Sequence, residues 1–408
     1  MGQGCFVRTK QKAKFWAHRG LRAALAAAAV ILPSQEAAAL WDDRLEVFAA
    51  ERITSDDNVF RNATRESDTF NTTSLGFNLD LPVSRQRFLV GAAVHDNRYD
   101  KNSTLDNTGK EARGIWLWQI GNNLNGRMGY TYSEALANFS NFSGLRTRNI
   151  LKANQTFIDA RYLITPRIRL AGGVTDGEQR NSDIGRQTND INISTAEASV
   201  SYVTPAGNSL GIAVRDEDGH LPNRQVVLAS LIDNTYSQRG TGVIGEYIVS
   251  GQSRLSGRVD RVSRDYAQVS QRNYDGTTAR AIYDWTPGGR FSLNAVVQKD
   301  LAVSEDIQTT LVLVKGFILR PAYAWTDRTT LSGVLDYSKR DYLSDPGIAL
   351  TGANARSDKV RITGVTLAYR PLRNVTLLGT YQHEDRSSTF APADYTANVL
   401  SASARIAF

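Results

Sequence analysis

The chain ends in the stretch LSASARIAF, residues 400–408, which decides the fold class. Apolar side chains occupy every second position of this stretch: Leu400, Ala402, Ala404, Ile406 and Phe408. Small or charged side chains (Ser, Arg and Ala) occupy the positions between them. Because successive side chains of a β-strand point to opposite faces, a period of two residues predicts a strand with one apolar and one polar face.

The same alternation recurs through the chain, with good examples in residues 124–133, 195–202, 291–298 and 331–338. The apolar face of these segments is rich in Ala, Gly and Val and often ends in Tyr or Trp. The core of a soluble sandwich would be richer in Leu, Ile and Phe, whereas a membrane barrel carries its apolar face between aromatic girdles. The pattern favours a membrane barrel, with a soluble all-β repeat protein as the alternative.

The connections between these segments alternate between short and long. Short turns rich in Pro, Gly and Asn occur at 82–84, 122–123, 165–167, 204–208, 250–252, 286–289, 326–327 and 371–373. Longer polar stretches occur near 54–68, 98–109, 137–148, 180–189, 217–233, 264–272, 301–307, 339–356 and 386–393. Outer-membrane barrels have short periplasmic turns, long outer loops and even strand numbers. We therefore predict an all-β fold, a transmembrane antiparallel up-and-down barrel of about 18 strands.

The N-terminal segment has the features of a cleaved signal peptide. Basic residues between Arg8 and Arg22 precede the apolar run Ala23 to Leu32, and small residues follow at Ala37 to Ala39. Such a run is too short to cross a membrane as a helix, which takes about twenty residues. We expect a signal peptide at 1–39 and one barrel domain at 40–408. Cys5, the only cysteine, would leave with the signal peptide, so the mature chain would have no thiol.

In a chain that is exported by a signal peptide, the C-terminal strand can also serve as a signal for barrel assembly. An amphipathic strand ending in an aromatic residue resembles the signal that barrel-assembly machinery reads by adding a strand to its own sheet. We expect the five apolar residues from Leu400 to Phe408 to be that signal and the protein to reside in the outer membrane of a bacterium.

The charge balance gives no support for binding nucleic acid. The whole chain has 48 Lys and Arg against 41 Asp and Glu. Residues 1–39 contain six basic residues and one acidic residue, which leaves 48 − 6 = 42 against 41 − 1 = 40, a net charge of +2, in the mature part. A nearly neutral domain lacks the basic excess that binds polyanions.

No catalytic constellation is visible, and we predict neither an enzyme nor a cofactor or metal site. The mature histidines are His95, His220 and His383, which lie in distant segments without the spacing of a zinc site. His383, Glu384 and Asp385 are consecutive, but consecutive strand residues point to opposite faces and cannot converge.

Charged residues on the polar face of the predicted strands are expected to line the lumen, because a charge facing lipid costs about 2–4 kcal/mol at mid-membrane. The candidates are Arg127, Asp159, Arg161, Arg169, Glu197, Arg215, Glu246, Arg258, Asp260, Arg280, Asp284, Asp336, Glu384 and Arg405. They could set the selectivity of a channel, or pair across neighbouring strands and stiffen the wall. The long loops 217–233 and 339–356 could constrict the lumen, meet partners outside or simply cover the mouth.

Segments spread over the mature chain resemble the exopolysaccharide-biosynthesis outer-membrane proteins of the EpsL type, which accompany exosortase/PEP-CTERM systems. They are LWDDRLEVFAAE (40–51), DDNVFR (56–61), TTSLGFNLDLPVSRQRF (72–88), SYVTPAGNSLG (201–211), DGTTARAIYDWTP (275–287), RDYLSDPG (340–347) and YRPLRNVTL (369–377).

This resemblance implies a passive outer-membrane channel in the biosynthesis or export of an extracellular polysaccharide. Its partners would be that polysaccharide, outer-membrane lipid and lipopolysaccharide, and periplasmic polysaccharide-export proteins. A general diffusion porin, or a structural barrel that anchors a secretion complex, is the alternative, and a protein that binds partners through its surface loops is a third.

Overall fold

The computed structural model describes residues 44–141, 146–228, 232–303, 311–343 and 356–408. The predicted signal peptide and parts of four long connections lie outside the described residues.

Eighteen antiparallel strands form a single sheet. In chain order they are β1 Leu45–Asp56, β2 Asp68–Val83, β3 Gln86–Tyr99, β4 Asn107–Ile120, β5 Leu124–Leu136, β6 Ile150–Thr165, β7 Ile168–Asn181, β8 Ile191–Val203, β9 Ser209–His220, β10 Thr235–Ser250, β11 Ser253–Tyr266, β12 Tyr274–Trp285, β13 Phe291–Val303, β14 Leu311–Thr326, β15 Thr329–Tyr342, β16 Ser357–Leu372, β17 Val375–Ser388 and β18 Tyr395–Ala407.

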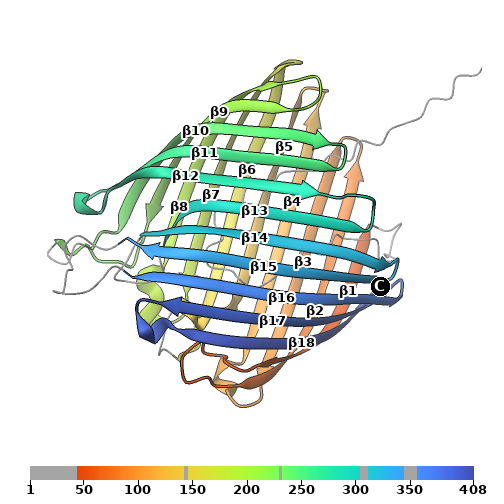
Figure 1. Ribbon diagram of the computed structural model, residues 1–408, viewed down its shortest axis with the longest axis vertical. Coiled ribbons are helices and arrows are strands. Elements are labelled where there is room, and N and C mark those ends of the chain that lie inside the picture. Colours follow the sequence, from red (N-terminus) through yellow and green to blue (C-terminus); the bar gives the residue numbers. More distant parts are fainter. Residues whose placement is uncertain (1–43, 142–145, 229–231, 304–310, 344–355) are drawn as a thin grey trace, which may run out of the picture. The chain divides into compact units, whose positions relative to one another are not determined.

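The sheet closes on itself. Each strand pairs with the next one along the chain, and β1 also pairs with β18, from Phe48 opposite Ala407 to Asp56 opposite Val399. Figure 1 looks across this wall, with the later strands in front of the earlier ones. Closure leaves no free sheet edge, so every strand satisfies its backbone hydrogen bonds within the wall. The predicted up-and-down barrel of eighteen strands is confirmed.

The two ends of the barrel differ in their connections. All eight short turns lie at one end, here called the turn end, and the C-terminus lies there too (Figure 1). Gly288 and Gly289 have φ values of +66° and +79° in one of these turns, a conformation that favours glycine. The long connections lie at the opposite end, here called the loop end, and several contain a short 3₁₀ helix. Among the described residues, no helix is long and apolar enough to cross a membrane.

Most strands that run toward the loop end extend further than the sequence predicts. The predicted loop 217–233 begins later, because β9 continues to His220, and β10 starts at Thr235, two residues after the predicted end of the loop. Here the outer face becomes polar, with Asp216 and Asp218 exposed, although the backbone pairing continues. Antiparallel pairing does not require lipid, so strands can project beyond the apolar belt that the sequence pattern detects.

The outer face has the pattern expected for lipid contact. Apolar side chains of the middle of the wall are exposed, for example Ile212, Val297 and Leu400 at 58%, 60% and 61%. Seven successive strands that run toward the turn end each finish near an exposed aromatic side chain: Tyr162, Tyr202, Tyr247, Trp285, Trp325, Tyr369 and Phe408. A continuous apolar belt above an aromatic girdle is the surface of a barrel in the bacterial outer membrane.

Candidate functional site: the lumen and its mouth

Side chains of the inner face are identified by contacts that skip strands. Arg258 on β11 binds Glu197 on β8 at 2.9 Å, although β9 and β10 lie between them. Arg169 on β7 similarly donates to Ser209 Oγ on β9 at 2.9 Å, across β8. Such contacts form on the concave side of a closed wall, so these residues face the lumen. The alternation along each strand then assigns its other inner residues.

Most of the predicted lumen residues form pairs. Arg127 binds Asp159, Arg258 binds Asp260 as well as Glu197, and Arg215 binds Glu217; Glu246 binds Arg254, Glu384 binds Arg61, and Arg405 binds Glu46. Asp284 accepts a hydrogen bond from Asn294 at 2.8 Å. Asp159 therefore pairs with the neighbouring strand rather than with Arg161, two residues along its own strand.

Three predicted lumen residues have no such partner. Arg161, Arg280 and Asp336 form no hydrogen bond or ion pair with another residue in the part of the chain that the structure describes. Their functional groups are therefore available to water or to a passing solute.

The inner charges are most exposed at the turn end and least exposed at the loop end. Near the turn end, the side chains of Arg87 and Asp80 are 54% and 41% exposed. A few residues further in, Arg127 and Asp159 are 17% and 21% exposed. At the loop end, Arg386 and Asp358 form an ion pair in which both side chains are 0% exposed. The lumen is therefore wet at the turn end and closely packed at the loop end.

Arg386, on β17, is the centre of the packing at the loop end. Its Nε donates to Asp358 Oδ2 at 3.1 Å, and its Nη2 donates to the hydroxyl of Tyr342 at 3.1 Å. Its Nη1 donates to the backbone carbonyl of Ser140, which belongs to the connection between β5 and β6. One guanidinium thus fastens a distant loop to the inner wall.

Arg61 fastens a second connection, the one between β1 and β2. Its Nε lies 2.8 Å from Glu384 Oε2 on β17, and its Nη1 lies 2.8 Å from Asp56 Oδ2. Burial opposes the charge of this guanidinium, but the carboxylates of Glu384 and Asp56 outweigh it and raise the pKa of Arg61 above its ordinary value. Arg61 therefore stays charged at every accessible pH.

A small apolar cluster joins the same connections above the lumen. It comprises Val59, Phe60, Leu105 and Phe139, with Tyr99 and Leu136 packed against it. The rings of Phe60 and Phe139 meet edge to face at 5.1 Å between centroids. Arg186 of the β7–β8 connection lies over the Phe139 ring at 5.8 Å, and Arg224 of the β9–β10 connection donates to Asn189. The contacts thus run from β17 to the far side of the mouth.

The predicted loops contribute unequally to this cover. Residue Arg224, in the predicted loop 217–233, takes part, whereas most of the predicted loop 339–356 lies outside the described residues. Arg61, Asp358 and Arg386 were not among the residues that the sequence pattern predicted for the lumen. Because Glu384 faces inward, the period of two also predicts that Arg386 faces inward. The pattern does not predict its partner Ser140, which is 246 residues away in the sequence.

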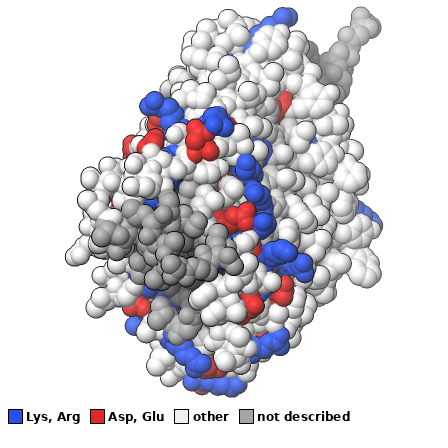
Figure 2. All heavy atoms as spheres, turned by 60° about the vertical axis from the view of Figure 1, so that its left-hand side comes forward, with Lys and Arg blue, Asp and Glu red and all other residues white. Residues whose placement is uncertain are grey.

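Figure 2 brings the loop end forward and shows Lys, Arg, Asp and Glu side chains gathered over it, whereas the visible wall beside it is mostly uncharged. This distribution fits a wall in lipid and a polar end in water.

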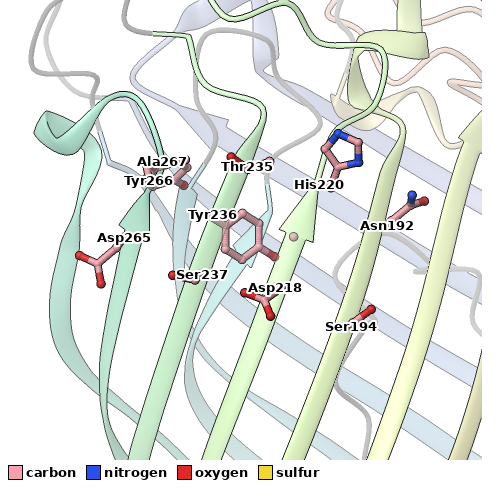
Figure 3. Close-up of a pocket in the computed structure, with 11 residues that line it drawn as sticks. Asn192, Ser194, Asp218, His220, Thr235, Tyr236, Ser237, Asp265, Tyr266 and Ala267 are labelled. Atoms are coloured by element: carbon pink, nitrogen blue, oxygen red, sulfur yellow. The ribbon is translucent and has the colours of Figure 1, made fainter.

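A shallow groove of about 400 Å³ lies at the loop-end tips of β8–β11 (Figure 3). Its lining includes Ser194, Asp218, His220, Ser237 and Asp265. Within the described ranges, no group of three or more His, Cys, Asp or Glu side chains could hold a metal ion. His383, which bonds to Asn398, and Glu384, which bonds to Arg61, have separate partners and do not form a catalytic group.

Comparison with known proteins supports the barrel class. Residues 257–408 match the protein family described as Putative beta-barrel porin 2. No curated protein sequence matches the chain.

Among solved structures, the chain is similar to the outer membrane protein OpdK from Pseudomonas aeruginosa, with 13% identity, coverage of 89% of this chain and 99% of that one, and a TM-score of 0.46. It is also similar to a BenF-like porin from Pseudomonas fluorescens Pf-5, with 13% identity, coverage of 91% and 100%, and a TM-score of 0.47. OccAB3 from Acinetobacter baumannii shows 12% identity, coverage of 90% and 98%, and a TM-score of 0.45. Similarity this weak assigns neither a substrate nor a partner.

The closed wall, the apolar belt and the family match over the last third of the chain agree with one another. The chain is a porin-like β-barrel of the bacterial outer membrane.

Proposed function

We propose that the protein is a passive channel for small hydrophilic solutes. The observation that carries the proposal is the wet, charged inner wall, in which Arg87 and Asp80 remain about half exposed inside a closed eighteen-stranded barrel. Barrels of sixteen to eighteen strands leave an aqueous channel unless loops fill it. The loops fastened by Arg61 and Arg386 narrow the mouth and therefore limit the size of the solute.

The channel is expected to favour anions. Arg161 and Arg280 have no carboxylate partner among the described residues, and Arg320 donates only to the neutral Asn294. Asp336 and Asp300, which accepts only the backbone N–H of Leu301, are inner acids that form no ion pair among the described residues. An excess of available guanidinium groups attracts negative solutes, since charges that line a pore set its selectivity.

Swelling of proteoliposomes tests the channel directly. The purified protein should admit a monosaccharide faster than a trisaccharide and should exclude a dextran, whereas liposomes without protein should not swell. Equal exclusion of all three solutes would refute an open channel.

The reversal potential in a KCl gradient tests the preference for anions. Wild type should pass chloride more readily than potassium, and R161Q/R280Q should reduce the preference. R239Q is the matched control, because Arg239 lies on the outer face, where it pairs with Asp216 at 2.7 Å. An equal shift of the reversal potential in R161Q/R280Q and in R239Q would mean that Arg161 and Arg280 do not line the lumen.

A second candidate is the export of an extracellular polysaccharide, favoured by the segments that resemble EpsL-type proteins. In that function residues 1–39 direct the chain across the inner membrane, the terminal strand engages the barrel-assembly machinery, and periplasmic polysaccharide-export proteins dock on the short turns. In a polymer-producing host, an in-frame deletion should then trap polymer in the periplasm. Unchanged polymer in the medium would leave only the diffusion channel.

A further inference from the structure

Four lysines form a row across the outer face of adjacent strands β13–β16. The residues Lys299 and Lys315, Lys315 and Lys339, and Lys339 and Lys359 are register partners. They alternate with apolar outer residues such as Val297 and therefore face outward. With strands about 4.8 Å apart, this lysine row extends over about 14 Å. Like charges placed directly opposite each other destabilise a sheet, so the row needs a compensating anion.

The height of the lysine row coincides with the upper edge of the apolar belt. Lys315 precedes the girdle residue Trp325 by ten residues on β14 (325 − 315), and Lys359 precedes Tyr369 by ten on β16 (369 − 359). Ten residues at about 3.4 Å each, tilted by ~40°, rise about 26 Å. The apolar band of such barrels is about 25 Å tall. The lysine row is thus at the level of the lipid headgroups of the outer leaflet.

Aromatic side chains directly below the lysine row support this level. Phe317 and Tyr337, on β14 and β15, lie two residues nearer the turn end, with ring centroids 5.8 Å apart. Aromatic rings gather at the boundary between acyl chains and headgroups, so the lysines immediately above them meet the headgroups.

The protein itself neutralises the lysine row only in part. Asp341 lies 3.4 Å from Lys315 Nζ and 3.1 Å from Lys339 Nζ, while Lys299 Nζ donates to the hydroxyl of Thr277 at 3.0 Å. Lys359 has no ion pair with any residue of the described ranges.

Arg361, next on the outer face of β16, adds a charge and lies opposite Asp385. Together with the lysine row, this makes five cations against the two acids Asp341 and Asp385, an excess of 5 − 2 = 3 positive charges.

A second row, at the loop end of β4–β6, has the opposite design. There Glu134 lies between Lys110 and Lys152 in the register and binds them at 3.5 and 3.6 Å. In this row the glutamate separates the two lysines, and the excess is only 2 − 1 = 1 positive charge. The four lysines of β13–β16 instead lie directly opposite one another.

We infer that the lysine row is a binding site for the phosphate groups of an outer-leaflet glycolipid, such as the lipid A part of lipopolysaccharide. The apolar wall below, with Phe317 and Tyr337, would receive the acyl chains while the ammonium groups bind the phosphates. The phosphate groups of such a lipid supply the negative charges that the protein does not place beside the lysine row. This inference depends on the position of the barrel in the membrane and not on what passes through the lumen.

Native mass spectrometry of the delipidated full-length barrel, with added diphosphoryl lipid A and with EDTA to remove bridging divalent cations, tests the inference. Wild type should bind diphosphoryl lipid A about tenfold more tightly than phosphatidylethanolamine, and K299Q/K315Q/K339Q/K359Q should lose that preference. K110Q/K152Q, in the row where Glu134 separates the lysines, should bind as wild type does. The quadruple Lys→Arg variant should keep the preference, because it keeps the charge.

Three results would overturn the site. The glutamine variant could bind as tightly as wild type, the control variant could lose as much binding, or wild type could show no preference for lipid A. Competition by millimolar inorganic phosphate would indicate a site for free phosphate instead of lipid. Heat-modified gel mobility shows whether each variant is folded, and a misfolded glutamine variant is replaced by the pair K315Q/K339Q.

Discussion

The two ends of the lumen use the same residue types to opposite effect. At the turn end, Arg87 and Asp80 form an ion pair in water, with about half of each side chain exposed. At the loop end, Arg386 and Asp358 form an ion pair that is shielded completely. The strands alternate in the same way at both ends, so the difference comes from the connections folded over the mouth. The same inner charges therefore contribute to permeation at one end and to stability at the other.

The largest expected effect is that of R386M. It leaves the carboxylate of Asp358 buried without its main partner and releases the backbone of Ser140. Breaking a buried pair by removing one partner costs about 3–5 kcal/mol. The free energy of unfolding in urea, followed by tryptophan fluorescence in lipid vesicles, should fall by that amount. R386M/D358L should regain part of the loss, because it also removes the buried carboxylate, which in R386M keeps only Arg356 as a charged partner. A loss below about 1 kcal/mol in R386M would mean that the two ends of the lumen do not differ in this way.

A smaller effect is expected for R258M, halfway along the lumen. Arg258 binds Glu197 at 2.9 Å and Asp260 at 2.7 Å, but water reaches about a fifth of its side chain. Hydrogen bonds to charged groups contribute about 1.5–3 kcal/mol, and water offsets part of this, so we expect a loss of about 2 kcal/mol in the same unfolding experiment. A loss equal to that of R386M would mean that the exposure of an inner ion pair does not determine how much the pair stabilises the fold.

Asp183, in the β7–β8 connection at the mouth, gives a prediction that depends on pH. The hydroxyl of Thr147 and the backbone N–H of Gly185, which donate to its carboxylate, outweigh burial and lower the pKa of Asp183. A lowered pKa in the folded state stabilises the fold above the unfolded-state pKa of about 4, and this contribution disappears as pH falls through the folded-state value. Wild type should exceed D183N by about 1 kcal/mol at pH 7, and the difference should vanish toward pH 2. A stability difference between wild type and D183N that does not change with pH would mean that the effect comes from the shape of the side chain and not from the charge of the carboxylate.

The smallest effect on stability is expected for R87M at the turn end. Exposed ion pairs contribute about 0–1 kcal/mol, so the free energy of unfolding should change by less than about 1 kcal/mol. The same variant should nevertheless shift the ion selectivity, because Arg87 lies in the wet part of the lumen. Stability loss without a selectivity change would place Arg87 outside the conducting path.

The alternation of residues and the chemistry of the turns predict much of this molecule. Pro166, Pro205 and Pro287 mark turns where the structure has them, and the period of two separates the exposed Leu400 and Ile406 from the inner Arg405. Such signals are local, because turn conformation and face alternation depend on neighbouring residues.

The closure of the mouth could not be predicted in the same way. Arg61 meets Glu384 across 323 residues of sequence, and Arg386 meets Ser140 across 246. No local pattern specifies which loop folds onto which wall, since that depends on packing among connections of variable length. The lysine row is an intermediate case: each lysine is visible in the sequence, but their alignment follows only from the register of four strands.

Single-channel recording in planar bilayers tests the central claim most directly, which is that the lumen is a water-filled path narrowed at the loop end. Wild type should insert with discrete current steps, and R386M should pass a larger current because the β5–β6 connection is no longer fastened. Inserted wild-type protein that passes no current above that of the bare bilayer, with R386M equally silent, would contradict the account.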